Sequence, residues 1–579
     1  MARRILLRQN GSTGTVPAGF SSLAVSTSGD LKVGSSTGSV ASVRDYVSNV
    51  ALSGTDLVFS ATGSAFSGNV SLSSLSGGGG GLTSSGTVDY VPKFTSVDTL
   101  SSTSSIIDTG LTVSVTADLT ANSVNRLKIG LGGGNVSTNI ALGCNTLSNN
   151  SSGNNNVAIG FESLKNNSGG TYNTAIGQNA LCANSIGSSN VAIGRLALLS
   201  NTTGSNNTAI GQNAQRTNTT GANNTAIGYQ SLFSNSTGNN NTAIGNCSLR
   251  SNTTGSNNIS IGASASLCNT SASNNVALGC LALNRNFTGC HNTAIGHSSL
   301  RYNSTGNYNV AIGRYSLRNN CADNNIAIGL CALRTNTTGI NNIAIGRCAL
   351  RDNTTAWMNT ALGDGALMKN TTGQFNTAIG SGALKYNTTG EFNTAIGNSS
   401  LLNNTTADGN TAIGSVALCC NTTGQFNTAI GGSALRYNTC GSDNLAIGNS
   451  SLMCNTTACN NIAIGYKTLQ NNTTGCHNTA IGRCVLRNNT TGKNNIAIGC
   501  YALCSNTTGG YNIGIGSNVQ TGGFTGSIIL GAQAIATGNC QLVIGSSALP
   551  IGPVNTESCT STRTLDVIIN GTPQKILLA

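Results

Sequence analysis

Asn173-Thr174-Ala175-Ile176-Gly177 is the unit from which most of this chain is built. The same five residues return at Asn376–Gly380, and close variants carry the final glycine along the chain from Gly143 to Gly516. These ladder glycines are 17 residues apart, except across Gly313–Gly329, where the interval is 16. A fixed short period is typical of repeat architectures, in which each unit is supported by its neighbours. Any function must therefore be sought on the stack of repeats.

Each interval repeats the same residue types around the ladder glycine. Alanine or serine lies two residues before it, isoleucine one before and leucine four after, and Asn-Thr-Thr-Gly closes the unit. The interval lacks a helical period and is too short for a helix pair. We predict one coil of a parallel β-solenoid per repeat, with one strand ending at the glycine and a second strand around the leucine. The Asn-Thr-Thr-Gly run is expected to turn, because Asn and Gly tolerate left-handed backbone.

Strand side chains alternate between two faces, so adjacent alanine and isoleucine must point in opposite directions. We expect isoleucine and leucine to fill the coil, alanine to face a neighbouring chain, and asparagine and threonine to form stacking ladders. The predicted core residues are Ile176, Ile193, Ile210, Ile227, Leu181, Leu198 and Leu232.

Composition limits the classes of protein to be considered. Charged residues make up 8% of the chain and aromatic residues 4%, and the net charge is +12, which predicts a dilute basic surface. No apolar run reaches the roughly 18 residues of a membrane span. The basic start at Met1–Arg8 has too short an apolar run for a secretion signal, so we expect synthesis in a cytoplasm.

The 20 cysteines are scattered over many repeat positions. Only Cys331 with Cys348 and Cys459 with Cys476 hold equivalent positions in adjacent repeats. Side-by-side ladder geometry is poor for a disulfide, so we expect free thiols. No cysteine or histidine cluster has the spacing of a metal site, and no cofactor is expected.

The chain is expected to have five parts: a β-rich attachment region at 1–76, a glycine linker at 77–81, a β-rich connector at 82–128, the solenoid array at 129–549 and a cap at 550–579. Predicted hairpins pair 22–26 with 30–34, 50–53 with 56–60, and 565–569 with 574–578 around Asn570-Gly571. A further strand is predicted at 111–115, and Leu127–Gly130 as an incomplete first rung.

The repeats resemble the head repeats of YadA-type trimeric adhesins. The match is best at Ile529–Gly545, where the interval between Gly531 and Gly545 shortens to that family's 14 residues. The resemblance covers most of residues 129–549. It implies a left-handed parallel β-roll that trimerises side by side into a fibre.

A second resemblance concerns the segments outside the array. Pro17–Val25, Ser28–Gly34 and Ala51–Phe59, and Gly86–Phe94 followed by Ile106–Val113, resemble the N-terminal regions of bacteriophage tail-fibre and virion-appendage proteins. In that family the N-terminus docks on the particle. We therefore expect a homotrimeric structural fibre of a virion that docks on tail or baseplate proteins and contacts the host surface, without nucleic-acid binding or membrane insertion.

Two other functions were weighed. The alternative is a bacterial cell-surface adhesin of the trimeric autotransporter kind, whose signal and membrane anchor this sequence does not show. An ice-binding solenoid would need a flat Thr-x-Thr face, whereas the threonines here are adjacent in a turn. The Asn-Thr-Thr runs also match N-glycosylation acceptors, but we interpret them as turn residues.

A basic column lies five residues after the ladder glycine. Arg301, Arg318, Arg334 and Arg351 occupy it in consecutive coils, and Tyr302, Tyr386 and Tyr437 follow basic residues of this column directly. The column is either a solvated ridge that keeps the fibre soluble or a track for a polyanion such as lipopolysaccharide or acidic capsule. Its members are Lys165, Arg216, Arg250, Arg301, Arg318, Arg334, Arg351, Lys385, Arg436 and Arg487.

An aromatic column lies five residues before the ladder glycine. Its rings could stack against sugars or pack between chains, and the second reading is favoured. The column holds Tyr172, Tyr308, Phe375, Phe392, Phe426 and Tyr511. His291 and His477 hold the same position in distant coils and are interpreted, with His297, as exposed polar residues.

Catalysis is not expected. Glycoside hydrolysis requires two carboxyl groups on one face, and we expect no two acidic residues of the array to share a position in adjacent coils. The array's carboxylates are Glu162, Asp323, Asp352, Asp364, Glu391, Asp408 and Asp443.

Overall fold

The computed structural model describes residues 128–546 and 548 together with ten short strands outside that range. The chain divides into two compact units, Met1–Thr116 and Ala117–Ala579. The predicted glycine linker at 77–81 and the predicted strand at 111–115 lie outside the described residues. The ten strands are β1 (Arg4–Ile5), β2 (Phe20–Val25), β3 (Leu31–Ser35), β4 (Val40–Ser42), β5 (Asn49–Ser53), β6 (Asp56–Ser60), β7 (Ser67–Ser71), β8 (Leu119–Thr120), β35 (Thr564–Ile569) and β36 (Thr572–Leu577).

The strands of the first unit form two antiparallel sheets. One has the order β1-β2-β3-β4 and the other β5-β6-β7. The predicted hairpins are confirmed, because β2 pairs with β3 and β5 pairs with β6, Asn49 lying opposite Ser60. The hairpin predicted near the C-terminus is also confirmed, with Thr564 opposite Leu577 across β35 and β36.

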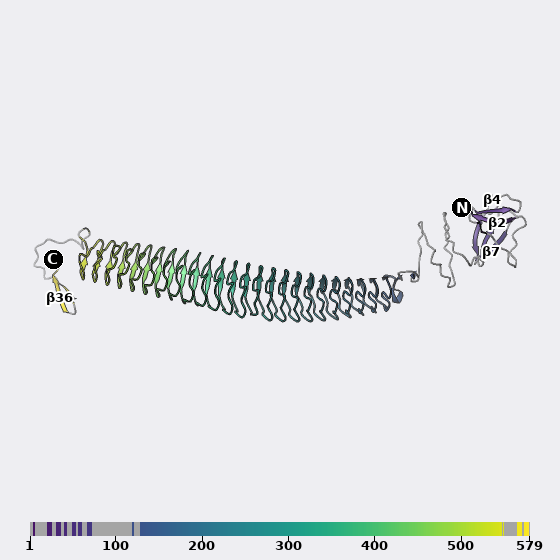
Figure 1. The fold of residues 1–579 in the computed structure, drawn as a ribbon, viewed down its shortest axis with the longest axis horizontal. Helices are drawn as coiled ribbons and strands as arrows, with labels where there is room; N and C mark the ends of the chain where they lie inside the picture. Colours follow the sequence, from purple (N-terminus) through teal and green to yellow (C-terminus); the bar gives the residue numbers. More distant parts are fainter. Residues whose placement is uncertain are drawn as a thin grey trace. The chain divides into compact units, whose positions relative to one another are not determined.

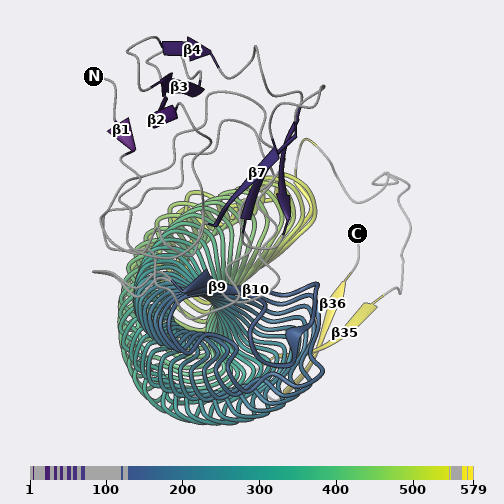
Figure 2. The same cartoon turned by 90° about the vertical axis from the view of Figure 1, so that its right-hand side faces the viewer.

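The second unit contains the solenoid, a parallel β-stack of about 24 turns (Figure 1). Each turn contributes one strand of three residues, and neighbouring strands pair in parallel and in register, as Thr174, Ala175 and Ile176 do with Val191, Ala192 and Ile193. The predicted all-β parallel solenoid is therefore confirmed. Seen end on, the coils superpose with a gradual rotation along the stack (Figure 2).

The solenoid strands follow one another at the repeat interval. They are β10 (Ile140–Leu142), β11 (Val157–Ile159), β12 (Thr174–Ile176), β13 (Val191–Ile193), β14 (Thr208–Ile210), β15 (Thr225–Ile227), β16 (Thr242–Ile244), β17 (Ile259–Ile261), β18 (Val276–Leu278), β19 (Thr293–Ile295), β20 (Val310–Ile312), β21 (Ile326–Ile328), β22 (Ile343–Ile345), β23 (Thr360–Leu362), β24 (Thr377–Ile379), β25 (Thr394–Ile396), β26 (Thr411–Ile413), β27 (Thr428–Ile430), β28 (Leu445–Ile447), β29 (Ile462–Ile464), β30 (Thr479–Ile481), β31 (Ile496–Ile498), β32 (Ile513–Ile515), β33 (Ile528–Leu530) and β34 (Leu542–Ile544).

The start of the stack differs from the prediction. Lys128–Gly130 is a strand, β9, but it pairs antiparallel with both β8 and β10. It is followed by a 3-10 turn, Gly133–Asn135. The described part of the predicted first rung, Lys128–Gly130, is therefore not a parallel rung, and the parallel stack begins at β10.

The second predicted strand of each coil is absent from the described repeats. The backbone after the ladder glycine is a tight bend in which Asn179 has φ 57° and Leu181 has φ 50°, both left-handed. A left-handed residue interrupts an extended chain, and two in alternation reverse it within a few residues. The left-handed backbone expected in the Asn-Thr-Thr-Gly run is not found there. Positive φ falls instead on the bend after the ladder glycine, on the ladder glycine itself and on the aromatic column.

The core is the reverse of the one predicted on the strand. Ala175, Ala192 and Ala209 are 0% exposed, whereas Ile176, Ile193 and Ile210 are half-buried. The coil is narrow: at Gly514, which takes the place of an alanine, an added Cβ would lie 2.7 Å from Leu503 Cγ. Only small strand residues fit opposite the leucines. Ile176, Ile193, Ile210 and Ile227 are therefore corrected to an outward column, while Leu181, Leu198 and Leu232 are confirmed as buried.

Two buried asparagine ladders hold the coils together. In the first, Asn184 Nδ2 donates to Asn167 Oδ1 at 2.8 Å and to the carbonyl of Gly187 at 2.9 Å. In the second, the backbone N–H of Asn190 donates to Asn173 Oδ1 at 3.0 Å. The stacking ladders predicted for asparagine and threonine are confirmed, and Thr202 Oγ1 likewise donates to the carbonyl of Thr219 at 3.0 Å. Side-chain amides thus replace the backbone partners that a second strand would have provided.

Candidate functional site: the basic and aromatic columns

The basic column is confined to one edge of the solenoid, directly after the buried leucine of each coil. Arg301, Arg318 and Arg334 are half-buried. The guanidinium carbons of Arg301 and Arg318 lie 5.0 and 5.3 Å from the ring centroid of Tyr302. Arg318 and Arg334 lie 5.5 and 5.7 Å from the centroid of Tyr315. The rings sit between the arginines, and cation–π attraction offsets part of the repulsion between stacked like charges.

Tyr315 is a contributor that the sequence analysis missed. It lies two residues after a ladder glycine rather than beside the basic column, and its φ is 62°. The left-handed backbone at that position brings it to the column, where Arg314 also lies 4.6 Å from its centroid. No sequence pattern distinguishes this placement, because it depends on the shape of the bend.

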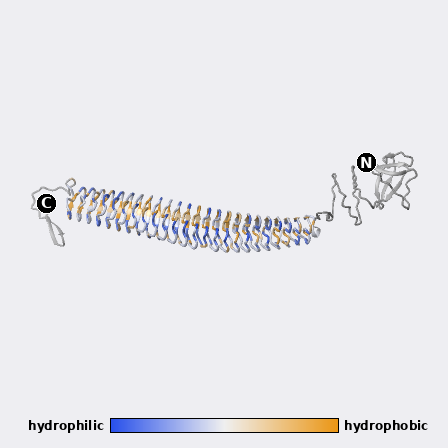
Figure 3. Ribbon diagram, viewed as in Figure 1, coloured by the Kyte–Doolittle hydropathy of each residue, from blue (hydrophilic) through white to orange (hydrophobic). Residues whose placement is uncertain are grey.

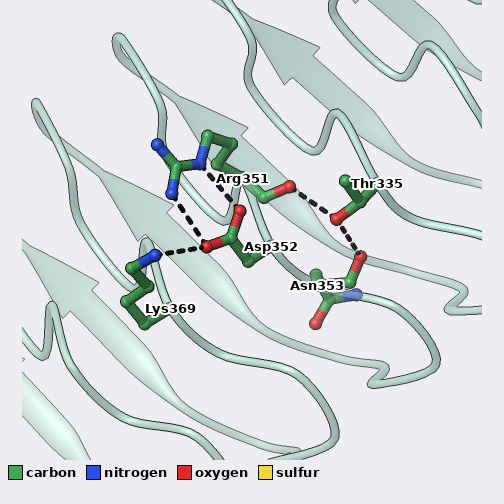
Figure 4. A network of polar contacts seen from close by, with 5 residues as sticks. All are labelled: Thr335, Arg351, Asp352, Asn353 and Lys369. Carbon is green, nitrogen blue, oxygen red and sulfur yellow. Dashed lines mark hydrogen bonds and ion pairs between the residues drawn. The ribbon is translucent and has the colours of Figure 1, made fainter.

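Arg351, the fourth predicted member, has a different environment (Figure 4). Its Nε donates to Asp352 Oδ1 at 2.7 Å and its Nη2 to Asp352 Oδ2 at 2.9 Å. Lys369 Nζ lies 3.0 Å from the same carboxylate. The hydrogen bonds from Arg351 hold the pKa of Asp352 below its usual value of 3.8. Arg351 is therefore paired with a carboxylate. Arg301, Arg318 and Arg334 have no acidic partner among the described residues and are half-buried.

Tyr386 and Tyr437, the other two predicted contacts, are not part of the cluster at Tyr302. Each pairs with the basic residue directly before it: Lys385 Nζ lies 5.3 Å from the centroid of Tyr386, and Arg436 Cζ 5.1 Å from that of Tyr437. These two sites are single cation–π pairs. Arg216 and Arg250 flank one ring, Phe233, at 5.7 and 5.8 Å. The segment around Tyr302 and Tyr315 instead brings three arginines of consecutive coils onto two rings.

The aromatic column lies at another corner of the coil, just before the buried asparagine that precedes each strand. Its members have left-handed backbone, with φ of 56° at Phe392 and 54° at Phe426. Five of its members are 59% to 65% exposed: Tyr172, Tyr308, Phe392, Phe426 and Tyr511. His291, His297 and His477 are exposed, as expected. His291 also stacks on Tyr308, with ring centroids 4.9 Å apart.

One expectation about the carboxylates was wrong. Glu391 and Asp408 are 17 residues apart and hold the same position in adjacent coils, where the backbone N–H of Glu391 donates to Asp408 Oδ1 at 2.7 Å. Both residues are half-buried beside the aromatic column. Each lies six residues before a ladder glycine, so the shared position could have been found by counting along the sequence.

Other chemistry in the described part of the chain is limited. Cys331, Cys348, Cys459 and Cys476 are free thiols, as expected. Within residues 128–546 no group of three His, Cys, Asp or Glu side chains is arranged to hold a metal. A search of the described residues for a helix long and apolar enough to cross a membrane found none. A shallow depression of about 420 Å³ lies where the shortened repeat omits a residue, lined by Asn307, Cys321 and Asp323 among others.

Comparison with known proteins found no matching family model, no similar curated protein and no similar solved structure.

Proposed function

We propose that this chain is the structural fibre of a virus particle, a phage tail fibre or similar appendage, whose solenoid projects from the particle and contacts the host surface. The observation that supports this most is the uninterrupted parallel stack of about 24 turns. At about 4.8 Å per turn the stack is roughly 115 Å long. Each coil is hydrogen-bonded to the next by backbone and side-chain ladders, so the repeat supplies length and stiffness. The phage-like segments near the N-terminus support attachment at that end.

The proposal includes assembly of three copies through the isoleucine column. An apolar stripe follows the strands along the stack (Figure 3). Within it the isoleucine column is partly exposed, and Leu278, Leu362 and Ile498 are 42%, 44% and 38% exposed. An uncovered stripe of this length is unfavourable in water and marks an association surface. Threefold packing of a parallel solenoid buries the same stripe on every copy.

Light scattering of the full-length chain tests the assembly. Three chain masses per particle are expected, and the triple variant Ile193→Ser, Ile210→Ser, Ile227→Ser should dissociate more readily. The control is Thr203→Ser, Thr220→Ser, Thr237→Ser, which changes exposed residues in three neighbouring coils. A native chain that is a monodisperse monomer would refute association through the stripe.

We propose that the arginines around Tyr302 and Tyr315 contact an acidic polysaccharide of the host surface. Arg301, Arg318 and Arg334 fall in consecutive coils, so their charges repeat at the spacing of the stack, and the two rings hold them in place. The double variant Arg318→Glu, Arg334→Glu should lose host adsorption at low ionic strength, where exposed charges are least screened. The matched control is Arg195→Glu, Arg483→Glu, which makes the same charge change elsewhere on the array. Unchanged adsorption of the first variant would exclude this contact.

Peptide mapping of purified virions tests the proposed location. Peptides of the array should appear in the particles at the stoichiometry of an appendage. If the chain is instead absent from particles and found on a bacterial surface, the alternative adhesin function replaces the fibre proposal.

A further inference from the structure

Aromatic rings from four of five successive coils form a patch at the corner of the solenoid. The rings of Phe375 and Phe392 are stacked with centroids 4.9 Å apart and planes 8° apart. Trp357 meets Phe375 edge to face at 4.8 Å. Phe426 belongs to the same column, one coil beyond Gly409. These four rings form a surface that is solvent-exposed at Phe392 and Phe426, by 59% and 60%. We call them the aromatic platform.

Gly409 opens the platform between Phe392 and Phe426. It occupies the column position at which the neighbouring coils carry rings, and its φ of 69° matches theirs. An added Cβ at Gly409 would lie 2.6 Å from Phe426 Cδ1, so the ring of Phe426 lies directly over this glycine. No side chain from position 409 covers Phe392. The platform therefore leaves the ring of Phe392 without a stacked neighbour on the side of Gly409.

Polar groups line the platform on one side. Gln374, Glu391, Asp408 and Gln425 occupy the preceding position in four consecutive coils and are half-buried. The backbone N–H of Glu391 donates a hydrogen bond to Oδ1 of Asp408. Among the described residues, the side-chain amides of Gln374 and Gln425 and the carboxylate of Glu391 make no hydrogen bond. Acceptors and donors beside exposed rings are thus available to a ligand.

The platform does not have the distribution expected of a seam between copies. The isoleucine column is apolar from β10 to β34, as a seam along the solenoid requires. The aromatic column instead holds Asn206, Asn223, Asn240 and Asn257 in successive coils and gathers rings locally. Its left-handed backbone suits asparagine and costs other residues about 1 kcal/mol. Three of its six rings, Phe375, Phe392 and Phe426, fall within four successive coils beside Trp357, and this local grouping indicates a local function.

From this arrangement we propose that the aromatic platform binds a neutral oligosaccharide chain. A pyranose presents C–H groups on one face and hydroxyls around its edge. The face stacks on an aromatic ring, and the edge hydroxyls hydrogen-bond to neighbouring carboxylates and amides. The rings of Phe392 and Phe426 supply the stacking surfaces, and Gln374, Glu391 and Gln425 the polar contacts. The uncompensated carboxylate of Glu391 disfavours acidic sugars here, unlike at the arginines around Tyr302.

Trp357 provides a direct measurement, because it is the only tryptophan of the chain and touches Phe375. The purified full-length chain is titrated with hexasaccharides of glucose, galactose, mannose or N-acetylglucosamine while tryptophan emission is recorded. Saturable change with at least one of them is expected. The variant Phe392→Asn, Phe426→Asn should bind that sugar about tenfold more weakly or worse, since each stacked ring contributes appreciably. Asparagine is the usual residue of this column, so the coil is expected to stay folded.

The matched control is Tyr172→Asn, Tyr511→Asn. These tyrosines hold the same column position with φ of 58° and 59°, but lie far from the platform. The control should bind as the native chain does. The proposal is overturned if none of the four sugars changes the emission, or if the platform variant binds as tightly as the native chain. It is also overturned if the platform variant, and not the control, has a lower mass by light scattering, because the rings would then pack between copies. The test uses purified chain and is independent of virion location.

Discussion

Asn184 donates a hydrogen bond of 2.8 Å from its side-chain amide to Asn167, the equivalent residue one coil earlier. Both side chains are 0% exposed. The same contact recurs through the array, for example from Asn201 to Asn184 at 2.8 Å. Each amide also donates to the carbonyl three residues later, so one side chain joins two coils and closes its own turn. The solenoid depends on these polar ladders as much as on its thin apolar core.

Replacing Asn201 by alanine should therefore destabilise its neighbourhood strongly. The change removes the donor to Asn184 Oδ1 and one of the two acceptors of Asn218 Nδ2, which keeps the carbonyl of Gly221. A buried polar group left unsatisfied costs about 1–3 kcal/mol. Hydrogen exchange measured by mass spectrometry should show faster exchange in the coils around 184–218. Thr203→Ala, at an exposed position of the same coil, is the control and should leave exchange unchanged. Equal exchange in the two variants would show that the ladder contributes little.

The ladder glycines should not tolerate a side chain. At Gly211, φ is 131° and an added Cβ would lie 2.5 Å from the carbonyl oxygen of Gly228, which is backbone and cannot move aside. Gly211→Ala should therefore break the pairing of adjacent coils, seen as protease cleavage near this residue. Gly365→Asn is the contrasting change, because a Cβ there meets nothing within 4 Å and φ is 65°. The Gly365→Asn variant should remain resistant to protease. Cleavage of both variants would contradict this explanation.

Because alanine and not isoleucine faces the core, the two strand positions should tolerate different side-chain sizes. Ala209 is 0% exposed, whereas Ile210 is half-buried. Ala209→Leu should destabilise the stack by about 1–3 kcal/mol or more, since overpacking forces side chains and backbone apart. Ile210→Ala should leave the coil intact. Urea denaturation followed by local hydrogen exchange distinguishes the two, and a reverse order of effects would restore isoleucine to the core.

The pair of Arg351 and Asp352 predicts a pH dependence. Because Arg351 lowers the pKa of Asp352 below 3.8, the folded state favours the carboxylate. This stabilisation is present above the ordinary pKa of an aspartate and is lost as pH falls through the lower folded value. Trp357 emission should report a lower urea midpoint at about pH 3 than at about pH 6, by a larger margin in the native chain than in Asp352→Asn. Asp443→Asn, a matched loss of one distant carboxylate, should retain the native margin.

Burial of the thiols predicts their reactivity. Burial raises the pKa of the Cys454 thiol, so less of it is thiolate at neutral pH, and thiolate is the reactive form. Cys440 is exposed. Iodoacetamide at neutral pH should label Cys440 faster than Cys454, as mass spectrometry of the peptides would show. Unfolding in urea is the control and should remove the difference; a difference that persists would come from local sequence instead.

The repeat of Asn-Thr-Ala-Ile-Gly was sufficient to predict a parallel solenoid, its repeat interval, its buried leucines and its asparagine ladders. The terminal hairpins could also be predicted, because strand alternation and an Asn-Gly turn are local signals. Glu391 and Asp408 each lie six residues before a ladder glycine, so their shared position can be found by counting along the sequence. These features depend on residues near one another in sequence or at one fixed spacing, and such relationships are visible without coordinates.

The tertiary structure alone decided which strand face is inside. Hydrophobicity favours isoleucine for a core, but the width of a one-strand coil leaves room only for small residues, mostly alanine, opposite the leucines. The left-handed bend at Asn179 and Leu181 sets that width, and it replaces the second strand that the pattern predicted. The same bend brings Tyr315 to Arg318 and Arg334. Backbone curvature is a property of the closed coil, so no single repeat of the sequence specifies it.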